Sequence, residues 1–155
     1  MSNPVVTSYS RVFAAPVEEA FDRVLPTPLP ELFHRRYGPI PPIKSVEGQD
    51  GVWGTVGQTR TIRTADGGSM REELTRVERP SAFGYTISDV TGPMKALVGR
   101  VNGLWSFDAT EGGTRVTWEW TIYPKSALAR PVMGPFCALW RRYAARSFDE
   151  LAKIV

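Results

Sequence analysis

Few side chains in this 155-residue sequence could take part in acid–base, nucleophilic or metal chemistry. His34 is the only histidine and Cys137 the only cysteine, which excludes a histidine-rich metal site, a cysteine-based metal cluster and an internal disulfide. The sequence contains no P-loop, dinucleotide-binding fingerprint or Ser–His–Asp order, so we expect neither a metal ion nor a cofactor. The remaining candidates are arginines, carboxylates and tyrosines, which form ion pairs or donate hydrogen bonds. No catalytic residue can be assigned from these types alone.

The ionisable candidates concentrate on one predicted hairpin in the middle of the chain. Arg60 and Arg63 fall on its first strand, and Glu72 and Glu73 on its second. Because successive side chains of a strand point to opposite faces, only one of the two glutamates can point inward, and the sequence leaves open which. An inward carboxylate needs a partner such as Arg60, since an unpaired buried charge is prohibitively costly. Solvated cross-strand pairs are the alternative interpretation.

Aromatic residues are plentiful, with five Trp, five Tyr and seven Phe. In the segment 114–123 the alternation places Trp118 and Trp120 on one face with Val116 and Ile122. Trp105 occupies a comparable position on the preceding predicted strand. These indoles either pack against a helix as ordinary core or present flat apolar walls to a ligand. The expected polar anchor of such a ligand is His34 or the Arg60/Glu72 pair, and Tyr85 is one of the residue types available for proton transfer.

The elements that must position these residues are mostly strands joined by short turns. Alternation and β-rich composition predict strands at 5–13, 43–47, 57–64, 69–78, 82–88, 100–108 and 114–123. Glycine-rich turns such as Asp66-Gly67-Gly68 separate them, which favours an antiparallel meander. A first helix is predicted at 16–25 and a shorter one within 31–37, in a proline-rich connector that carries His34 and Tyr37.

A long amphipathic helix is predicted after Pro131. Apolar residues recur there at three- and four-residue steps, which is typical of a helix that buries one wide stripe. Met133, Phe136 and Trp140 fall in its N-terminal half and either line a cavity or pack in the core. The longer apolar segment 89–99, which includes Met94, is either a lid or an ordinary loop folded onto the body.

Composition and charge narrow the class of protein. Hydrophobic residues make up 42% and charged residues 23%, as in ordinary globular domains, and we expect one domain over 1–155. The net charge of +3 comes from dispersed residues, so nucleic acid is not an expected partner. No apolar run is long enough to span a membrane and no signal peptide is visible, so the expected location is the cytoplasm. The oligomeric state is left open.

The order of elements resembles the START-like or Bet v 1-like superfamily, which includes the polyketide cyclase/dehydrase and lipid-transport group. The resemblance rests on turns and on the start of the first helix, in the segments 10–21, 57–60, 67–74 and 112–118. It implies an α+β helix-grip fold, in which a curved antiparallel sheet wraps around a long C-terminal helix, with two short helices after the first strand. It also implies a cavity between sheet and helix, but no single reaction.

We therefore expect this chain to bind or carry an apolar small molecule such as a lipid, polyketide or aromatic metabolite. The alternatives are an aromatase/cyclase-like enzyme that uses the same cavity and a regulatory, partner-binding protein. The candidate ligand-binding residues are His34, Tyr37, Arg60, Glu72, Tyr85, Met94, Trp105, Trp118, Trp120, Met133, Phe136 and Trp140.

Overall fold

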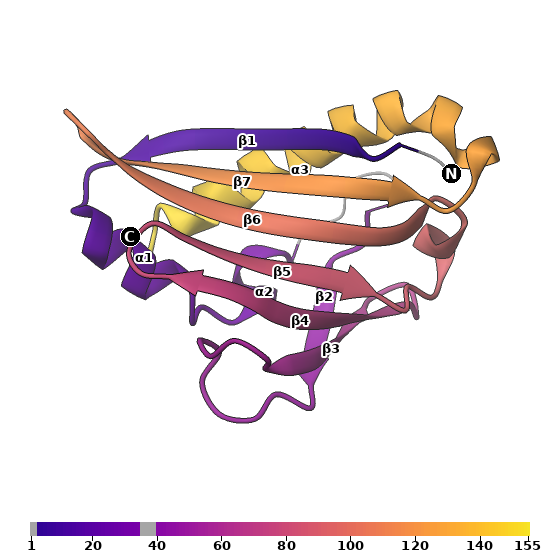
Figure 1. The fold of residues 1–155 in the computed structure, drawn as a ribbon, viewed down its shortest axis with the longest axis horizontal. Helices are drawn as coiled ribbons and strands as arrows, with labels where there is room; N and C mark the ends of the chain where they lie inside the picture. The colour runs from indigo at the N-terminus through magenta and orange to yellow at the C-terminus, as the bar shows by residue number, and fades with distance from the viewer. Residues whose placement is uncertain (1–2, 35–39) are drawn as a thin grey trace.

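A seven-stranded antiparallel sheet forms the centre of the computed structural model, which describes residues 3–34 and 40–155. The strands lie in the order β1-β7-β6-β5-β4-β3-β2 (Figure 1), so the first strand pairs with the last and every other neighbour is sequential. Their bounds are β1 Val5–Phe13, β2 Ile43–Glu47, β3 Thr59–Thr64, β4 Ser69–Glu78, β5 Ala82–Ser88, β6 Val98–Thr110 and β7 Gly113–Pro124.

The helices gather on one side of this sheet. The long helix α3 (Met133–Leu151) runs behind the sheet in the view of Figure 1 and contacts β1. The short helices α1 (Val17–Val24) and α2 (Leu29–Leu32) follow β1, and α2 contacts both β2 and α3. Two 3₁₀ turns, η1 (Pro93–Ala96) and η2 (Ala127–Val132), precede β6 and α3. The expected helix-grip architecture is confirmed.

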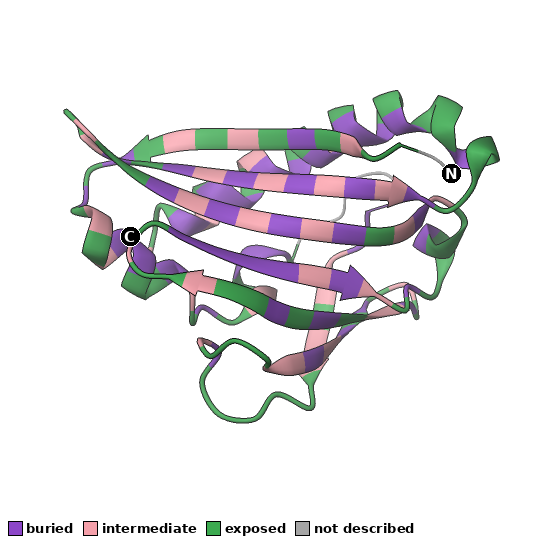
Figure 2. Cartoon of the chain, in the orientation of Figure 1, coloured by how far each residue is buried: buried purple, intermediate pink, exposed green. Residues whose placement is uncertain are grey.

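Strict alternation explains how β6 and β7 form one wall of the core. Along β7 every second residue from Thr114 to Pro124 is buried, and β6 alternates in the same way from Val101 to Phe107. Figure 2 shows this as bands of purple and pink along both strands. The buried set packs against the apolar stripe of α3, in which Trp140, Ala144, Phe148 and Leu151 are fully enclosed. Burial on one face fixes the register of these strands, because a one-residue shift would expose the whole set.

The observed elements differ from the sequence predictions mainly at their ends. Strand β6 begins at Val98 and reaches Thr110, because its pairing with β7 continues past an irregularity beside Gly99. Strand β3 begins at Thr59 rather than at residue 57, since Gly57 and Gln58 close the preceding loop onto Leu74. The long helix stops at Leu151, and the last residues continue as tighter turns.

The turn between β6 and β7 requires glycine at one position. Gly113 has a φ of 134°, which side-chain-bearing residues rarely adopt, and a Cβ there would lie 2.1 Å from the carbonyl oxygen of Phe13. Glycine at this position therefore allows β1 and β7 to approach each other where the chain enters the first helix.

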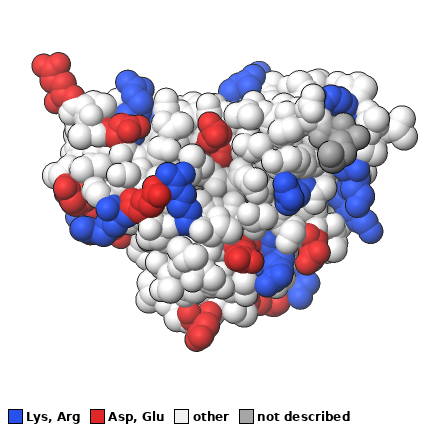
Figure 3. All heavy atoms as spheres, in the orientation of Figure 1, with Lys and Arg blue, Asp and Glu red and all other residues white. Residues whose placement is uncertain are grey.

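The outer face of the sheet carries charges of both signs. On the face shown in Figure 3, acidic and basic side chains are interspersed among neutral ones. Exposed ion pairs of the molecule include Arg76 with Glu78 and Arg79 with Asp22. Exposed pairs of this kind contribute little to stability. None of the described helices has the length and apolar character that a membrane crossing requires.

Candidate functional site

A cavity lies between the inner face of the sheet and the segment that contains α1 and α2. Strands β3 to β7 supply one wall, and Tyr143 of α3 and Phe33 close it from the helical side. Its volume is about 70 Å³. That is room for a few water molecules, and less than the roughly 300–1,000 Å³ of a drug-sized site. An occupant must therefore be small, or the wall must move outward to admit it.

Aromatic rings make up much of the wall. Trp105 stacks on Trp118 with ring centroids 5.2 Å apart, and Phe83 continues the stack on the other side of Trp105. This row follows from the register, because the three residues are direct cross-strand partners on β5, β6 and β7. Phe33 lies parallel to Tyr143 at 5.4 Å and also contacts Trp118. Flat faces on several sides favour a planar apolar occupant.

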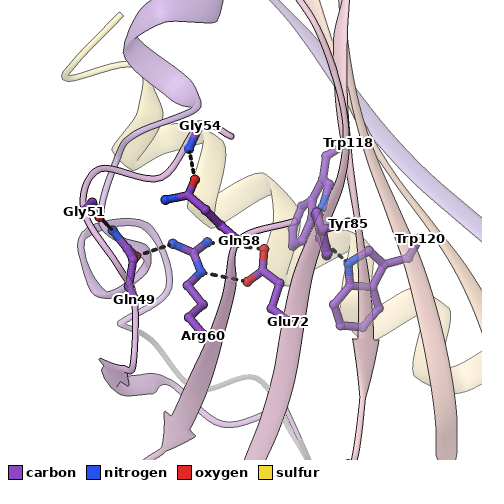
Figure 4. Close-up of polar contacts among 9 residues, drawn as sticks. All are labelled: Gln49, Gly51, Gly54, Gln58, Arg60, Glu72, Tyr85, Trp118 and Trp120. Carbon is purple, nitrogen blue, oxygen red and sulfur yellow. Dashed lines mark hydrogen bonds and ion pairs between the residues drawn. The ribbon is translucent and has the colours of Figure 1, made fainter. Parts of the chain in front are cut away.

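The Tyr85 hydroxyl is the hydrogen-bonding centre of this wall. It accepts one hydrogen bond from Nε1 of Trp118 and one from Nε1 of Trp120, both at 2.9 Å (Figure 4). Burial raises the pKa of Tyr85 well above its ordinary value, and the nearby Glu72 carboxylate raises it further. The hydroxyl is therefore neutral at physiological pH. The hydroxyl therefore supplies the acceptor that these two buried indole N–H groups need.

Gly103 makes this arrangement of Tyr85 possible. Gly103 lies between Tyr85 and Trp120 in the cross-strand row. A Cβ on Gly103 would lie 2.1 Å from Cζ of Tyr85 and 2.4–2.5 Å from its two Cε atoms. The tyrosine ring therefore lies across the glycine, and this position brings its hydroxyl to the two indoles. A glycine inside a strand often marks such a close approach.

A buried ion pair forms the polar edge of the cavity. Arg60 Nε and Nη2 donate to the two carboxylate oxygens of Glu72 at 3.1 and 3.3 Å, and Nη1 donates to Gln49 at 3.0 Å (Figure 4). Both members of the pair are almost fully buried, with 5% of Arg60 and 3% of Glu72 exposed. Burial raises the pKa of the Glu72 carboxyl, and the guanidinium of Arg60 opposes that rise. Glu72 is therefore the inward glutamate that the sequence left undetermined.

The loop between β2 and β3 completes the polar edge. Its Trp53 is only 2% exposed, and the guanidinium carbon of Arg60 lies 3.7 Å from the centre of its indole ring. The amide of Gln58 holds this loop. Its oxygen accepts from the backbone N–H groups of Gly54 and Thr55 at 2.7 Å, and its nitrogen donates to the carbonyl groups of Asp50 and Val52. Gln58 thus fixes the backbone on both sides of Trp53.

Replacing Gln58 with alanine should loosen this loop without unfolding the sheet. The change removes four hydrogen bonds to the backbone, and we expect amide exchange at Gly54 and Thr55 to accelerate about 10-fold or more. Hydrogen–deuterium exchange measures this directly, with the β6 and β7 amides as internal control. Unchanged exchange at Gly54 and Thr55 would show that Gln58 does not hold the loop.

The structure brings together seven of the twelve residues selected from the sequence. The cavity is lined by Arg60, Glu72, Tyr85, Met94, Trp105, Trp118 and Trp120. Met94 belongs to η1, so the segment 89–99 folds onto the body and contributes one buried side chain to the wall.

The other five selected residues lie elsewhere. Met133, Phe136 and Trp140 are buried in the core but do not line the cavity. The ring of Trp140 packs against Trp118 and Trp120, which do line it. His34 is 42% exposed at its side chain, with Nε2 3.3 Å from Oε1 of Glu150 on the C-terminal helix. Tyr37 lies outside the described residues.

Three residues with a role in the site were not selected from the sequence. Trp53 sits between glycines in a loop, where an aromatic side chain is a signal for burial. Gly103 interrupts a predicted strand, which signals a close approach, but the pattern does not show which side chain approaches. Tyr143 belonged to the apolar stripe of the long helix and gave no separate signal. Among the described residues, no group of three or more His, Cys, Asp or Glu side chains is arranged to hold a metal ion.

Comparison with known proteins identifies a family and a set of solved structures with a similar fold. A family model described as "Polyketide cyclase / dehydrase and lipid transport" matches residues 4–155. No curated protein matches the sequence.

Solved structures share the fold at low sequence identity. Ginseng major latex-like protein 151 from Panax ginseng is 12% identical with a TM-score of 0.70, and the match covers 99% of each chain. Protein MLL2253 from Mesorhizobium loti is 17% identical with a TM-score of 0.65, over 97% of this chain and 96% of that one. Ara h 8.0201 is 16% identical with a TM-score of 0.63, over 96% and 99%.

Proposed function

Because this chain belongs to the polyketide cyclase/dehydrase and lipid transport family, we propose that it binds a small, largely apolar molecule in the cavity between the sheet and the helices. The observation that carries this proposal is the chemistry of the wall. Aromatic rings from β5, β6, β7 and the helical side surround the space, and one ion-paired edge is its main charged feature. Apolar surface with a few fixed polar groups is typical of small-molecule sites.

The small volume of the cavity narrows the proposal. Compounds with a single ring or two fused rings come nearest to the available volume, whereas a long acyl chain requires a much larger cavity. The wall that can yield is the helical side, because the sheet wall is fixed by continuous strand pairing and the loop around Trp53 is held by Gln58. Binding is therefore expected to be accompanied by a small outward movement of that side.

The direct test is native mass spectrometry of the protein purified from its own host, followed by organic extraction. The proposal predicts a stoichiometric adduct of low mass that is released by solvent. A protein that is empty on isolation and gains no thermal stability with lipids or fused-ring aromatics would contradict it.

Filling the cavity should abolish binding while leaving the fold intact. Met70 is a half-buried lining residue on β4, and Met70→Trp extends a large ring toward the open space. We expect the affinity for the extracted ligand, measured by calorimetry, to fall at least about 10-fold, as overlap in a closed site costs 1–3 kcal/mol. Val52→Trp is the matched control, because Val52 is 76% exposed and the same ring there leaves the cavity unchanged. Equal affinities for the two variants would place the ligand elsewhere.

A second candidate function is proton transfer on a ligand bound in this cavity. The observation that favours it is the buried Glu72, with a raised pKa, on the same wall as the neutral hydroxyl of Tyr85. Such a pair could remove a proton from a carbon next to a carbonyl group and return it. The test is exchange of that hydrogen for deuterium, followed by NMR. If the protein is an enzyme, we expect Glu72→Gln to stop the exchange and preserve binding. If it is a carrier, we expect no exchange that depends on the protein.

A further inference from the structure

The Tyr85 hydroxyl has one hydrogen and no acceptor for it among the described residues. A phenolic hydroxyl offers one donor and two acceptor positions. Trp118 and Trp120 donate to its oxygen and occupy the acceptor positions, and no described side chain or backbone group accepts its hydrogen. Two donors on one oxygen polarise the O–H bond and strengthen it as a donor. The next hydrogen-bonding partner of Tyr85 must therefore be an acceptor.

The threonine and charged side chains around the cavity are already engaged. Thr27 donates to the carbonyl oxygen of Arg23, and Thr64 donates to Asp66. Arg60 donates to Glu72 and Gln49, so its positive charge is matched by a carboxylate that is equally buried. An anionic ligand would place a second negative charge beside Glu72 without a free cation to balance it. The charge arrangement therefore favours a neutral ligand.

A second hydroxyl faces the same cavity from the helical side. Tyr143 on α3 is a lining residue, and its hydroxyl makes no hydrogen bond to any described residue. Burial, and then the neighbouring Tyr85, raise the pKa of Tyr143, so it too is neutral and able to donate. The cavity thus combines flat apolar walls with two hydroxyl groups that have hydrogens to give.

We propose that Tyr85 donates its hydrogen to an acceptor oxygen of the ligand, so that the cavity selects neutral aromatic or conjugated ring compounds carrying a carbonyl group. The inference rests on the proposed ligand-binding function and specifies the chemistry of the ligand. A carbonyl oxygen suits the site because it accepts and does not donate, and because it can lie in the plane of a ring held between indole faces.

A matched pair of probes tests the inference on the unmodified protein. 1-Indanone and indane have the same fused ring system and differ by the carbonyl oxygen. We expect 1-indanone to bind roughly 3- to 10-fold more tightly by calorimetry, although indane is the more apolar compound. We also expect the infrared carbonyl stretch of bound 1-indanone to lie below its frequency in cyclohexane, as it does for a hydrogen-bonded ketone.

Tyr85→Phe then assigns the effect to the hydroxyl group. The variant keeps the ring and should remove both the preference for 1-indanone and the infrared shift, while indane binding is unchanged. It also leaves two indole N–H groups without their acceptor, so its fold is checked by circular dichroism. Tyr123→Phe is the control, because Tyr123 packs on Arg100 outside the cavity lining. If Tyr85→Phe does not fold, the carbonyl frequency of 1-indanone bound to the unmodified protein is the measurement that tests the hydrogen bond.

The outcomes separate this inference from the function on which it rests. Equal binding of the two probes, or a carbonyl frequency equal to that in cyclohexane, would overturn the role of Tyr85 and leave the apolar cavity as a binding site. Failure of both probes to bind at their solubility limits would overturn the proposed function, and the inference with it. Loss of both affinities equally in Tyr85→Phe would mean that the hydroxyl supports the wall rather than the ligand.

Discussion

Replacing Arg60 with methionine is expected to destabilise the protein by about 3–5 kcal/mol at neutral pH. Methionine preserves much of the side-chain length but leaves Glu72 buried without its cation. The free energy of unfolding, measured by urea denaturation, reports the loss. Arg63→Met is the matched control, because the Arg63–Glu47 pair is about half exposed at both side chains and should contribute at most about 1 kcal/mol.

The pH dependence of this loss has a defined sign. Burial already raises the folded-state pKa of Glu72, and removing Arg60 eliminates the interaction that opposes the rise. Protonated Glu72 is therefore favoured in the folded state, so stability is highest below the unfolded-state pKa and is lost as pH rises through the folded-state pKa. Arg60→Met should lose more stability than the unmodified protein between acidic and neutral pH.

A second substitution separates the charge from the packing. In Arg60→Met combined with Glu72→Leu the buried charge is absent, and we expect most of the lost stability to return. Two results would contradict the idea that the buried charge of Glu72 depends on Arg60. One is an Arg60→Met variant as stable as the unmodified protein at neutral pH, and the other is a double variant no more stable than Arg60→Met.

Replacing Gly103 with alanine is expected to displace Tyr85 and cost about 1–3 kcal/mol of stability or more. The new methyl group would overlap the phenol ring, which has Cζ 2.1 Å from the Cβ position, so the ring must leave the sheet surface. The hydroxyl then leaves the two indoles. NMR should show upfield shifts of the Trp118 and Trp120 indole N–H signals as their hydrogen bonds are lost.

Gly84 provides the control for this substitution. It lies on the neighbouring strand β5, and a Cβ there would meet its nearest neighbour, the Gly103 carbonyl oxygen, at 3.3 Å. Gly84→Ala should therefore shift neither indole signal and cost less stability. If Gly103→Ala leaves both indole signals in place, the close packing of Tyr85 on Gly103 does not determine the position of the hydroxyl.

The sheet and the long helix were predictable because their patterns are regular. The alternation in 114–123 follows from one buried face, and the three- and four-residue spacing after Pro131 follows from one buried helical stripe. Element ends were less predictable. The start of β3 depends on backbone hydrogen bonds to Leu74, and the start of β6 depends on the pairing of Val98 with Pro124. Periodicity reveals neither of these distant partners.

The site was predictable in its residue types and not in its contacts. The inward position of Glu72 depends on the register that pairs it with Arg60, and a one-residue shift of the same sequence would bring Glu73 inside. The packing of Tyr85 on Gly103 likewise depends on the register of β5 against β6. His34 and Glu150 are far apart in the sequence and meet only in the folded chain, so no local sequence pattern predicts their contact.

The most direct test of ligand binding in this cavity uses the indole N–H signals of the five tryptophans during titration with 1-indanone. Trp53, Trp105, Trp118 and Trp120 line the cavity and should report an occupant directly, with the largest shifts at Trp118 and Trp120, which share Tyr85 as acceptor. We predict saturable shifts of these signals that Met70→Trp abolishes and Val52→Trp preserves. Saturable binding with all indole signals unmoved would contradict the central claim, because the ligand would then lie outside the cavity.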